Sequence, residues 1–427
     1  MIREIQTLQY MGSKARILGP IYKEMERLDP DVVVDLFAGT CSVGYALKDL
    51  CEVSSNDIEE YAFVINEAVL NGCMCSEEDI DDYFMRVQSL FSKSQLRYRV
   101  PLGVEDAFMC GEISDWHAYK TYCETTPAVG YPARSDYDFS SLEENIEAIC
   151  SGHIPSEACL FVSYYANTYF GLRQCCEIDA LRSAAEEIKD ARLKRVILTA
   201  IMSAMSSSAS TTTHFAQYLK VNGKRSFRNL VEKRGKSIID LTREKIADFD
   251  RAGLLSMEAS CSLCLNLDYL DALAFVEEAS RESHVVVYAD PPYFKEHYSR
   301  YYHVLNTLCA YDYPCLSINP QTKEMSVGRY RASRNSSDFG KKGKALNAFK
   351  LLIKKCSDMG ADLVISYSSG SIVEVGDIVE YMEHYFDVKT VAVTLRHSTQ
   401  GRPSVTRPSV EEYIVVGMEK GRQQTNE

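Results

Sequence analysis

Apolar and polar positions along the first 72 residues predict parallel strands joined by helices. The apolar stretch 32–37 predicts a strand, and a second predicted strand ends at Asn56. Amphipathic stretches at 15–28, 42–50 and 59–70 predict helices around these strands. Strands that alternate with helices in this way are typical of a parallel α/β sheet.

The same alternation returns after residue 259. The last predicted strand, 412–417, follows its predecessor without a helix, so we expect the two to pair antiparallel. The further expected strands are 260–267, 285–289, 363–367 and 388–395, and the expected helices are 341–359 and 373–385.

Residues 73–258 have a different character. The stretch 98–137 is rich in Tyr, Pro, Gly and Asp and looks loop-like. A Ser- and Thr-rich stretch at 206–213 breaks the last of several helical patterns, while Tyr164, Tyr165, Tyr169 and Phe170 are interpreted as core residues. Those helical patterns cover 141–151, 156–169, 179–190 and 192–207. We therefore expect an α/β domain formed by 1–72 and 259–427, with a mainly helical insertion at 73–258.

Composition narrows the class of protein. Hydrophobic residues make up 46% of the chain and charged residues 25%, as in soluble globular proteins. The longest apolar run, 196–205, is too short to cross a bilayer, and the N-terminal residues lack the apolar core of a signal peptide. We therefore expect a cytoplasmic protein, without a membrane partner, whose fifteen cysteines are reduced.

The cysteine spacing does not predict a metal site. Cys261 and Cys264 form a CSLC motif, but no second pair or histidine cluster follows, as a zinc ribbon would need. We interpret CSLC as part of a buried strand and expect no metal.

Charge is unevenly distributed. A net charge of −13 argues against indiscriminate binding of nucleic acid. Two local stretches are nevertheless basic, 220–236 and 329–344, and a basic face on an acidic body is compatible with docking DNA. Arginine can pair with guanine and asparagine with adenine, although either can also contact phosphate alone. The candidate DNA contacts are Lys224, Arg225, Arg329, Arg331, Arg334 and Asn335.

The first chemical motif joins the strand at 32–37 to a glycine-containing turn. In the sequence DLFAGTCSVG, Asp35 lies in the predicted strand, and Gly39 belongs to the turn that follows and brings the backbone close to a bound ligand. Asp57 follows at the tip of the next strand, where a carboxylate can accept ribose hydroxyls. This order favours a nucleoside cofactor.

The second motif is DPPY, Asp290 to Tyr293, at the end of an apolar strand. Proline lacks an N–H donor and fixes the chain, so the carbonyl oxygens and the Asp290 carboxylate form a rigid group of acceptors. Tyr293 adds a flat ring. Acceptors beside an aromatic face suit a planar amine.

DLFAGT…G, NDIE and DPPY in this order resemble the Dam-type, α-group N6-adenine DNA methyltransferases. The resemblance implies a Rossmann-like, S-adenosyl-L-methionine (AdoMet)-dependent α/β sheet whose helical insertion recognises the target. Leu267-Asp268-Tyr269 is similar to the family's third motif. The segment that starts at Arg396 is similar to the family's target-base motif, which implies that Arg396 contacts DNA. The cofactor-binding residues so implied are Tyr10, Lys14, Asp35, Phe37, Ala38, Gly39, Asp57, Asp268 and Asp290.

The resemblance implies that the protein methylates double-stranded DNA and works as a monomer, with a cognate restriction nuclease as a further partner. The adenine is expected to flip out of the duplex and stack on Tyr293. Asp290 and the carbonyl of Pro291, which Pro292 helps to fix, would accept its N6 hydrogens. Cys41 departs from the family, which often has glycine there. Its Cβ could crowd the methionine part of the cofactor, although Cys is small enough for the cofactor-domain assignment to stand.

Other functions stay open. An RNA methyltransferase could share the fold. A non-catalytic DNA-binding or assembly subunit of a defence system is the alternative from another class, although intact Lys14, Asp57, Asp290 and Tyr293 argue against it. A cytosine methyltransferase would need a Pro-Cys thiol. Pro314-Cys315 lies after DPPY and is interpreted as a loop coincidence.

Overall fold

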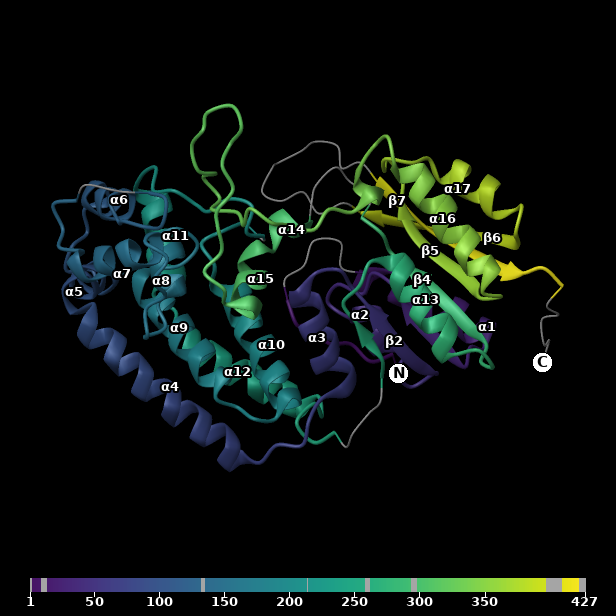
Figure 1. Ribbon diagram of the computed structural model, residues 1–427, viewed down its shortest axis with the longest axis horizontal. Coiled ribbons are helices and arrows are strands. Elements are labelled where there is room, and N and C mark those ends of the chain that lie inside the picture. The colour runs from purple at the N-terminus through teal and green to yellow at the C-terminus, as the bar shows by residue number, and fades with distance from the viewer. Residues whose placement is uncertain are drawn as a thin grey trace.

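A seven-stranded sheet organises the α/β part of the protein, on the right of Figure 1. The computed structural model describes residues 2–8, 14–131, 135–212, 214–257, 262–292, 298–396 and 409–421. The sheet has the order β3-β2-β1-β4-β5-β7-β6. Its strands are β1 (Val32–Asp35), β2 (Glu52–Asn56), β3 (Cys264–Leu265), β4 (Val285–Ala289), β5 (Asp362–Ser368), β6 (Phe386–Arg396) and β7 (Ser409–Glu419).

Strand pairing brings the carboxyl ends of the parallel strands to one edge. β1 pairs parallel with both β2 and β4, in a register that sets Val32 opposite Glu52 and Val285. β3 extends the sheet beyond β2, and β5 extends it beyond β4, also in parallel. The strand order therefore reverses beside β1, which is where open α/β sheets bind ligands. β7 is antiparallel to β5 and β6, so the predicted antiparallel final strand is confirmed.

Helices cover both faces of the sheet, which explains why the central strands β1, β4 and β5 are buried along their whole length and mostly apolar. Alternate residues of β1 point to opposite faces: Val33 packs in one core, and Val32 and Val34 pack in another. The first core includes α1 (Leu18–Leu28), α2 (Ser42–Leu47) and α3 (Glu60–Asn71). The second includes α13 (Tyr269–Ala279), α16 (Ala345–Asp358) and α17 (Val375–Met382).

The rest of the described chain is mainly helical and lies on the left of Figure 1. The predicted end of the helix near residue 206 is confirmed, because α10 ends at Ser208. The helices are α4 (Glu77–Arg97), α5 (Arg99–Met109), α6 (Trp116–Glu124), α7 (Ser140–Cys150), α8 (Leu160–Tyr165), α9 (Leu172–Glu186), α10 (Ala191–Ser208), α11 (Lys224–Arg234), α12 (Ile238–Arg251), α14 (Tyr298–Tyr301) and α15 (His303–Ala310). Short 3-10 turns cover Lys14–Arg16 and Asp338–Gly340. Among the described residues, no helix has the length and hydropathy that crossing a membrane requires.

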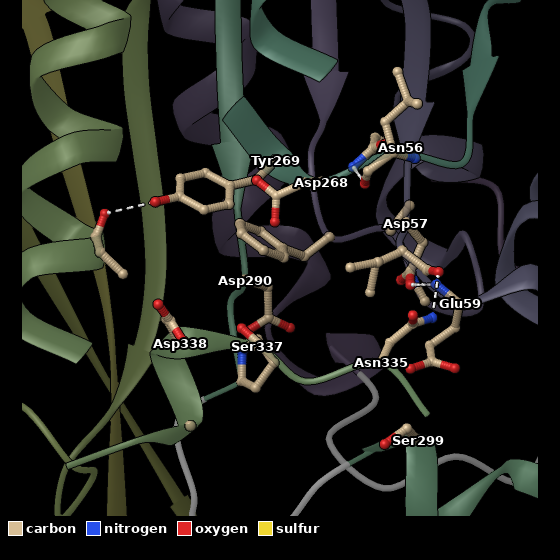
Figure 2. A pocket seen from close by; sticks show the side chains of 18 of the residues that line it. Asn56, Asp57, Glu59, Asp268, Tyr269, Asp290, Ser299, Asn335, Ser337 and Asp338 are labelled. Atoms are coloured by element: carbon tan, nitrogen blue, oxygen red, sulfur yellow. Dashed lines mark hydrogen bonds between the residues drawn. The ribbon is translucent and has the colours of Figure 1, made fainter. Parts of the chain in front are cut away.

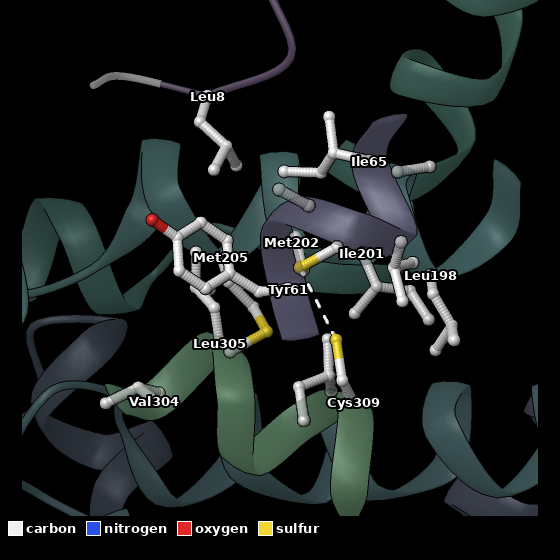
Figure 3. Packing of buried hydrophobic residues seen from close by; sticks show 14 of the residues in the cluster. Leu8, Tyr61, Ile65, Leu198, Ile201, Met202, Met205, Val304, Leu305 and Cys309 are labelled. Atoms are coloured by element: carbon white, nitrogen blue, oxygen red, sulfur yellow. Dashed lines mark hydrogen bonds between the residues drawn. The ribbon is translucent and has the colours of Figure 1, made fainter. Parts of the chain in front are cut away.

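The helical part and the sheet share one core. Figure 3 shows α3, α10 and α15 packed together, with Tyr61, Met202 and Cys309 at the contact. The Cys309 thiol lies 3.9 Å from the sulfur of Met202. Tyr164, Tyr165, Tyr169 and Phe170 are all buried, as predicted. Because α15 follows β4 in the chain yet packs on α10, this core extends beyond residues 73–258. The boundaries of the insertion stay a prediction.

Two local predictions were wrong. The stretch 98–137, expected to be loop-like, contains α5 and α6. Pro101 lies in the first turn of α5, where its missing N–H costs nothing, and Asp115 caps α6 by accepting from the N–H of His117. A strand was expected over 260–267, but in the described part of this range only the two residues of β3 form one. Cys264, expected to be buried, is half-buried.

Arg234 connects the helical elements from within. It is 2% exposed and donates to the Tyr119 hydroxyl at 2.9 Å, the Thr168 carbonyl at 3.0 Å and the Asn167 side-chain oxygen at 3.3 Å. Arg234→Ala would leave these buried acceptors unpaired, at about 1–3 kcal/mol each. We expect the free energy of unfolding to fall by about 3 kcal/mol or more and the thermal midpoint to fall by several degrees.

Arg228→Ala is the matched control, because Arg228 is exposed on the same helix. We expect that change to stay within about 0.5 kcal/mol. Equal thermal midpoints for the two variants would contradict the structural role of Arg234.

Candidate functional site

A cavity of about 650 Å³ opens at the carboxyl edge of the parallel strands. Its walls come from the turns after β1 and β2, the segment after β3, the end of β4 and residues within 335–351. Figure 2 shows Asp57 and Glu59 on one side, Asp338 on the other, and Asp290 between them. The cavity brings together these residues predicted from the sequence: Lys14, Asp35, Phe37, Ala38, Gly39, Asp57, Asp268, Asp290 and Pro292.

The turn after β1 is held by backbone bonds to both neighbouring strands. The N–H of Leu36 donates to Tyr288 of β4, and the N–H of Ala38 donates to Asn56 of β2. Gly39 has a φ of 51°, in the left-handed region that favours glycine. The turn thereby places residues 37–40 in the cavity wall.

Cys41 does not crowd the cavity, contrary to the expectation from the sequence. Its φ of 61° is also left-handed, which explains why glycine is suited to this position. The side chain is fully buried and is not part of the cavity wall. Its sulfur packs against the backbone of Gly44, where an added Cβ would lie only 3.2 Å away.

Asp57 is fixed by two backbone donors. One carboxylate oxygen accepts from the N–H of Gly39 and the other from the N–H of Glu59, both at 2.9 Å. Burial raises the pKa of Asp57 to about 6, while these two hydrogen bonds oppose the rise. Each oxygen keeps a further lone pair, so Asp57 can still accept hydroxyl groups of a ligand in the cavity.

Asp35 is the most deeply buried of the predicted carboxylates. It is 1% exposed and accepts from the N–H of Gly44 at 3.1 Å. Burial raises its pKa to about 7, and the nearby charges of Asp290 and Asp57 raise it further, against the hydrogen bond from Gly44.

Asp290 forms an ion pair inside the cavity. The ammonium of Lys14 lies 3.0 Å from one Asp290 oxygen and 3.5 Å from Glu412 of β7. Burial raises the pKa of Asp290 to about 6, whereas the charge of Lys14 lowers it. Lys14 is therefore shared between two acids, so it neutralises Asp290 only in part.

An aromatic cluster forms the wall beside Asp268. The rings of Phe37 and Tyr269 are 6.0 Å apart between centroids, and Phe339 lies 5.3 Å from Phe37 and 5.1 Å from Tyr269. Asp268 caps α13 by accepting from the N–H of Leu270 at 3.1 Å. A flat apolar group would fit against this wall.

Sequence reasoning did not identify Glu59 and Asn306. Glu59 is 5% exposed and accepts from the Asn306 side chain at 2.5 Å. Burial raises the pKa of Glu59 to about 7, while the bond from Asn306 lowers it. Glu59 is the last residue of the NDIE motif, so the motif gave a signal for it. Asn306 lies on α15, far from Glu59 in the sequence, and no sequence motif indicated it.

The basic stretch 329–344 is held largely by protein partners. Arg329, predicted to contact DNA, is 5% exposed, donates to the carbonyl of Tyr164 and lies over the Tyr131 ring. Its burial argues against that role, because a buried guanidinium cannot reach a phosphate. Arg331 makes two 2.7 Å bonds to Asp312.

The other two candidates of that stretch are also engaged. Arg334 lies 5.2 Å from the centroid of the Tyr330 ring. Asn335 donates to the carbonyl of Ile58 at 2.8 Å and lines the cavity. Lys224 and Arg225 are exposed on α11, outside the cavity wall.

Three predicted residues cannot be placed. Tyr10 and Tyr293 lie outside the described residues, as does the side chain of Arg396. Pro291 is buried directly after Asp290.

Comparison with known proteins agrees with this geometry. Residues 10–100, which contain the β1 turn and Asp57, match the family of D12 class N6 adenine-specific DNA methyltransferases. The family resemblance seen in the sequence is confirmed.

Several modification methylases resemble this chain over most of its length. Modification methylase LlaI of Lactococcus lactis subsp. lactis is 23% identical over 88% of this chain and 49% of its own length. Modification methylase StsI of Streptococcus sanguinis is 23% identical over 88% of this chain and 46% of its own length. The chain thus spans about half the length of these two relatives. Type II methyltransferase M.CviAII of Paramecium bursaria Chlorella virus 1 is 22% identical over 95% of this chain and 96% of its own length.

The raised pKa of Asp35 predicts how stability depends on pH. Folding raises the pKa from 3.8 to about 7, so between these values the folded state binds more protons than the unfolded state. The stabilisation is complete below pH 3.8 and is lost as pH rises through 7. Asp35→Asn removes this titration and keeps an acceptor for Gly44. The free energy of unfolding of the ligand-free variant should fall less steeply between pH 5 and 7.

The slopes should differ by up to about 1.4 kcal/mol per pH unit. Thermal or urea unfolding across this pH range measures them. Asp271→Asn, an exposed change on α13, serves as the control and should leave the slope unchanged. Parallel curves for wild type and Asp35→Asn would contradict the assignment.

Proposed function

We propose that this protein transfers a methyl group from AdoMet to the N6 amine of a flipped-out adenine in double-stranded DNA, within a specific sequence. The observation that carries the proposal is the position of Asp290, followed by two prolines, in a cavity shared with the β1 turn and Asp57. The family match supports the same reaction. On this proposal the sheet is a Rossmann-like methyltransferase domain, and the helical region recognises the target.

The cavity suits AdoMet in size and in charge. Its volume of about 650 Å³ is within the range of ligand pockets. Asp57 offers acceptors for ribose hydroxyls, and Phe37 and Tyr269 offer flat apolar surface for an adenine ring. Acidic side chains around the cavity complement a cationic ligand. Bound AdoMet would supply an electrophilic methyl group on a positively charged sulfur.

Asp290 and Pro291 would hold the amine to be methylated. The Asp290 carboxylate and the Pro291 carbonyl would accept its two hydrogens and orient the nitrogen lone pair. Positive charge develops on that nitrogen during methyl transfer, and the carboxylate would stabilise it. Lys14, paired with Asp290 at 3.0 Å and with Glu412 at 3.5 Å, would fix the carboxylate in place. Tyr293 keeps its predicted role as the ring on which the base stacks.

The working monomer, the cytoplasmic location and a cognate restriction nuclease also belong to the proposal.

A direct assay distinguishes the proposed reaction from methyl transfer to RNA and from a non-catalytic role. The protein is incubated with AdoMet and unmethylated duplex DNA of mixed sequence, and the nucleosides are then identified by mass spectrometry. N6-methyladenine is the expected product. AdoMet binding without a methylated nucleoside would favour another substrate. Absence of AdoMet binding would favour the non-catalytic DNA-binding or assembly subunit.

Asp290→Asn should abolish turnover while AdoMet affinity stays within a few-fold. The amide lacks the negative charge that stabilises the developing positive charge, and its NH₂ group presents donors to another amine. N6-methyladenine formation and calorimetric AdoMet binding measure the two effects. Asp271→Asn, exposed on α13, should keep wild-type turnover. Near-normal turnover by Asp290→Asn would exclude this role for Asp290.

Activity should fall at acidic pH, because Asp290 must be ionised. With a pKa of about 6, its carboxylate becomes protonated as pH falls through 6, and kcat/KM should decrease there. Lys14→Met removes the charge that lowers the pKa of Asp290, so the acidic limb should move to higher pH. Rates at saturating AdoMet separate this shift from weaker cofactor binding. Lys23→Met, exposed on α1, should leave the limb in place. If the acidic limb of the pH profile also stays in place in Lys14→Met, the assignment of that limb to Asp290 is contradicted.

A further inference from the structure

A second hollow, of about 550 Å³, lies in the helical region beside α11. Amide side chains are its most frequent polar groups, and Val327 adds an apolar surface that is 56% exposed. The residues that the inference uses are Gln217, Lys220, Asn222, Ser226, Asn229 and Val327. Nothing in the proposed transfer reaction uses this hollow.

Its amide groups are available to a ligand. Gln217, Asn222 and Asn229 are exposed, and none of their side chains makes a hydrogen bond within the described residues. Ser226, by contrast, is used internally: it accepts from the N–H of Asn222 at 2.8 Å and donates to the carbonyl of Gly223 at 2.9 Å. Amides can pair in a bidentate manner with a base edge, adenine in particular.

Exposed cations lie in the hollow and on the helix beside it: Lys220 lines the hollow, and the others are on α11, which contributes Ser226 and Asn229 to the wall. Lys220, Lys224, Arg225 and Arg228 are exposed, and none forms an ion pair in the part of the chain that the structure describes. In the other basic stretch, Arg331 is paired with Asp312, and Lys341 and Lys344 with Asp338. A cation without an internal partner can contact a phosphate without first breaking an ion pair.

The hollow is tied to the catalytic cavity by a short hydrogen-bonded connection. The N–H of Phe215 donates to the carbonyl of Tyr301 at 2.8 Å, and the hydroxyl of Tyr330 donates to the carbonyl of Ala216. Ser299, two residues from Tyr301, lines the first cavity, and Gln217, two residues from Phe215, lines the second. In Figure 1, α14 lies between α11 and the sheet. The two sites are therefore joined through neighbouring, hydrogen-bonded segments of the fold.

We propose that this hollow reads base edges of duplex DNA that flank the target adenine, with Gln217, Asn222 and Asn229 as specificity-determining residues. Lys220, Lys224, Arg225 and Arg228 hold the adjacent phosphates, and Val327 suits a thymine methyl group. The inference rests on the proposed function. It assigns sequence reading to residues 217–229, whereas the side chains of 329–335 mainly fix the protein's own loops.

The test measures sequence context. Wild type and the variant Gln217→Ala/Asn229→Ala methylate a random duplex library, and sequencing maps N6-methyladenine. We expect the variant to lose discrimination at one or more flanking positions by about 5- to 150-fold, the range for one bidentate pairing. AdoMet binding should be unchanged, which shows that the variant is folded. Gln95→Ala, exposed on α4, is the matched control and should keep the wild-type context.

A second variant tests the cations. Lys224→Ala/Arg225→Ala/Arg228→Ala should weaken binding to all duplexes alike and keep the sequence context. The slope of log affinity against log salt concentration should decrease by up to about 2.7, since each phosphate contact contributes about 0.9. Lys93→Ala on α4 should leave the slope unchanged.

The outcomes separate the inference from the proposed function. If wild type produces no N6-methyladenine in DNA, the proposed function fails, and the inference fails with it. If wild type is active and Gln217→Ala/Asn229→Ala keeps its context, only the base-reading inference is overturned. An unchanged salt slope in the triple variant would overturn the phosphate contacts.

Discussion

Burial of carboxylates at the carboxyl edge of the parallel strands is the constraint on which the site depends. Asp35, Asp57 and Asp290 lie where water solvates their charge poorly, and burial raises the pKa of each. Ionised carboxylates in such a place need donors. Gly44 supplies an N–H to Asp35, Gly39 and Glu59 supply N–H groups to Asp57, and Lys14 supplies a charge to Asp290. The glycine turn therefore stabilises the acids as well as shaping the cavity.

This constraint links segments that are far apart in the chain. Asn56 donates to the carbonyls of Leu36 and Leu267, both at 3.2 Å, and so connects the ends of β1 and β3. Lys14 and Glu412 come from opposite ends of the sequence and meet beside Asp290. Movement of one strand end would break several of these bonds together. A cationic ligand would ease the repulsion among the acids, so the ligand-free cavity is prepared for positive charge.

The sequence predicted what local patterns determine. β4 matches its predicted range, β1 and α3 differ from theirs by no more than two residues, and the carboxylates at the strand ends meet as expected. The predictions failed where contacts between residues far apart in the sequence determine the structure. Tyr119 and Tyr122 are buried aromatic residues of a helical core, although their surrounding composition resembles a loop. Nothing next to Arg331 in the sequence indicates that Asp312 holds it, and the pairing of Asn335 with Ile58 needs the folded chain.

The distribution of charged partners is compatible with the proposed binding of DNA by an acidic protein. The net charge of −13 is an average over two surfaces with opposite chemistry. Around the first cavity, Asp35, Asp57 and Asp290 produce a negative field that suits a cationic ligand. On α11, beside the second hollow, Lys224 and Arg228 form no ion pair among the described residues. Because solvent and salt screen exposed charges beyond about 8–10 Å, a phosphate beside α11 would respond mainly to these local cations and little to the rest of the protein. The acidic surplus can then coexist with binding of a polyanion and disfavour contacts elsewhere on the molecule.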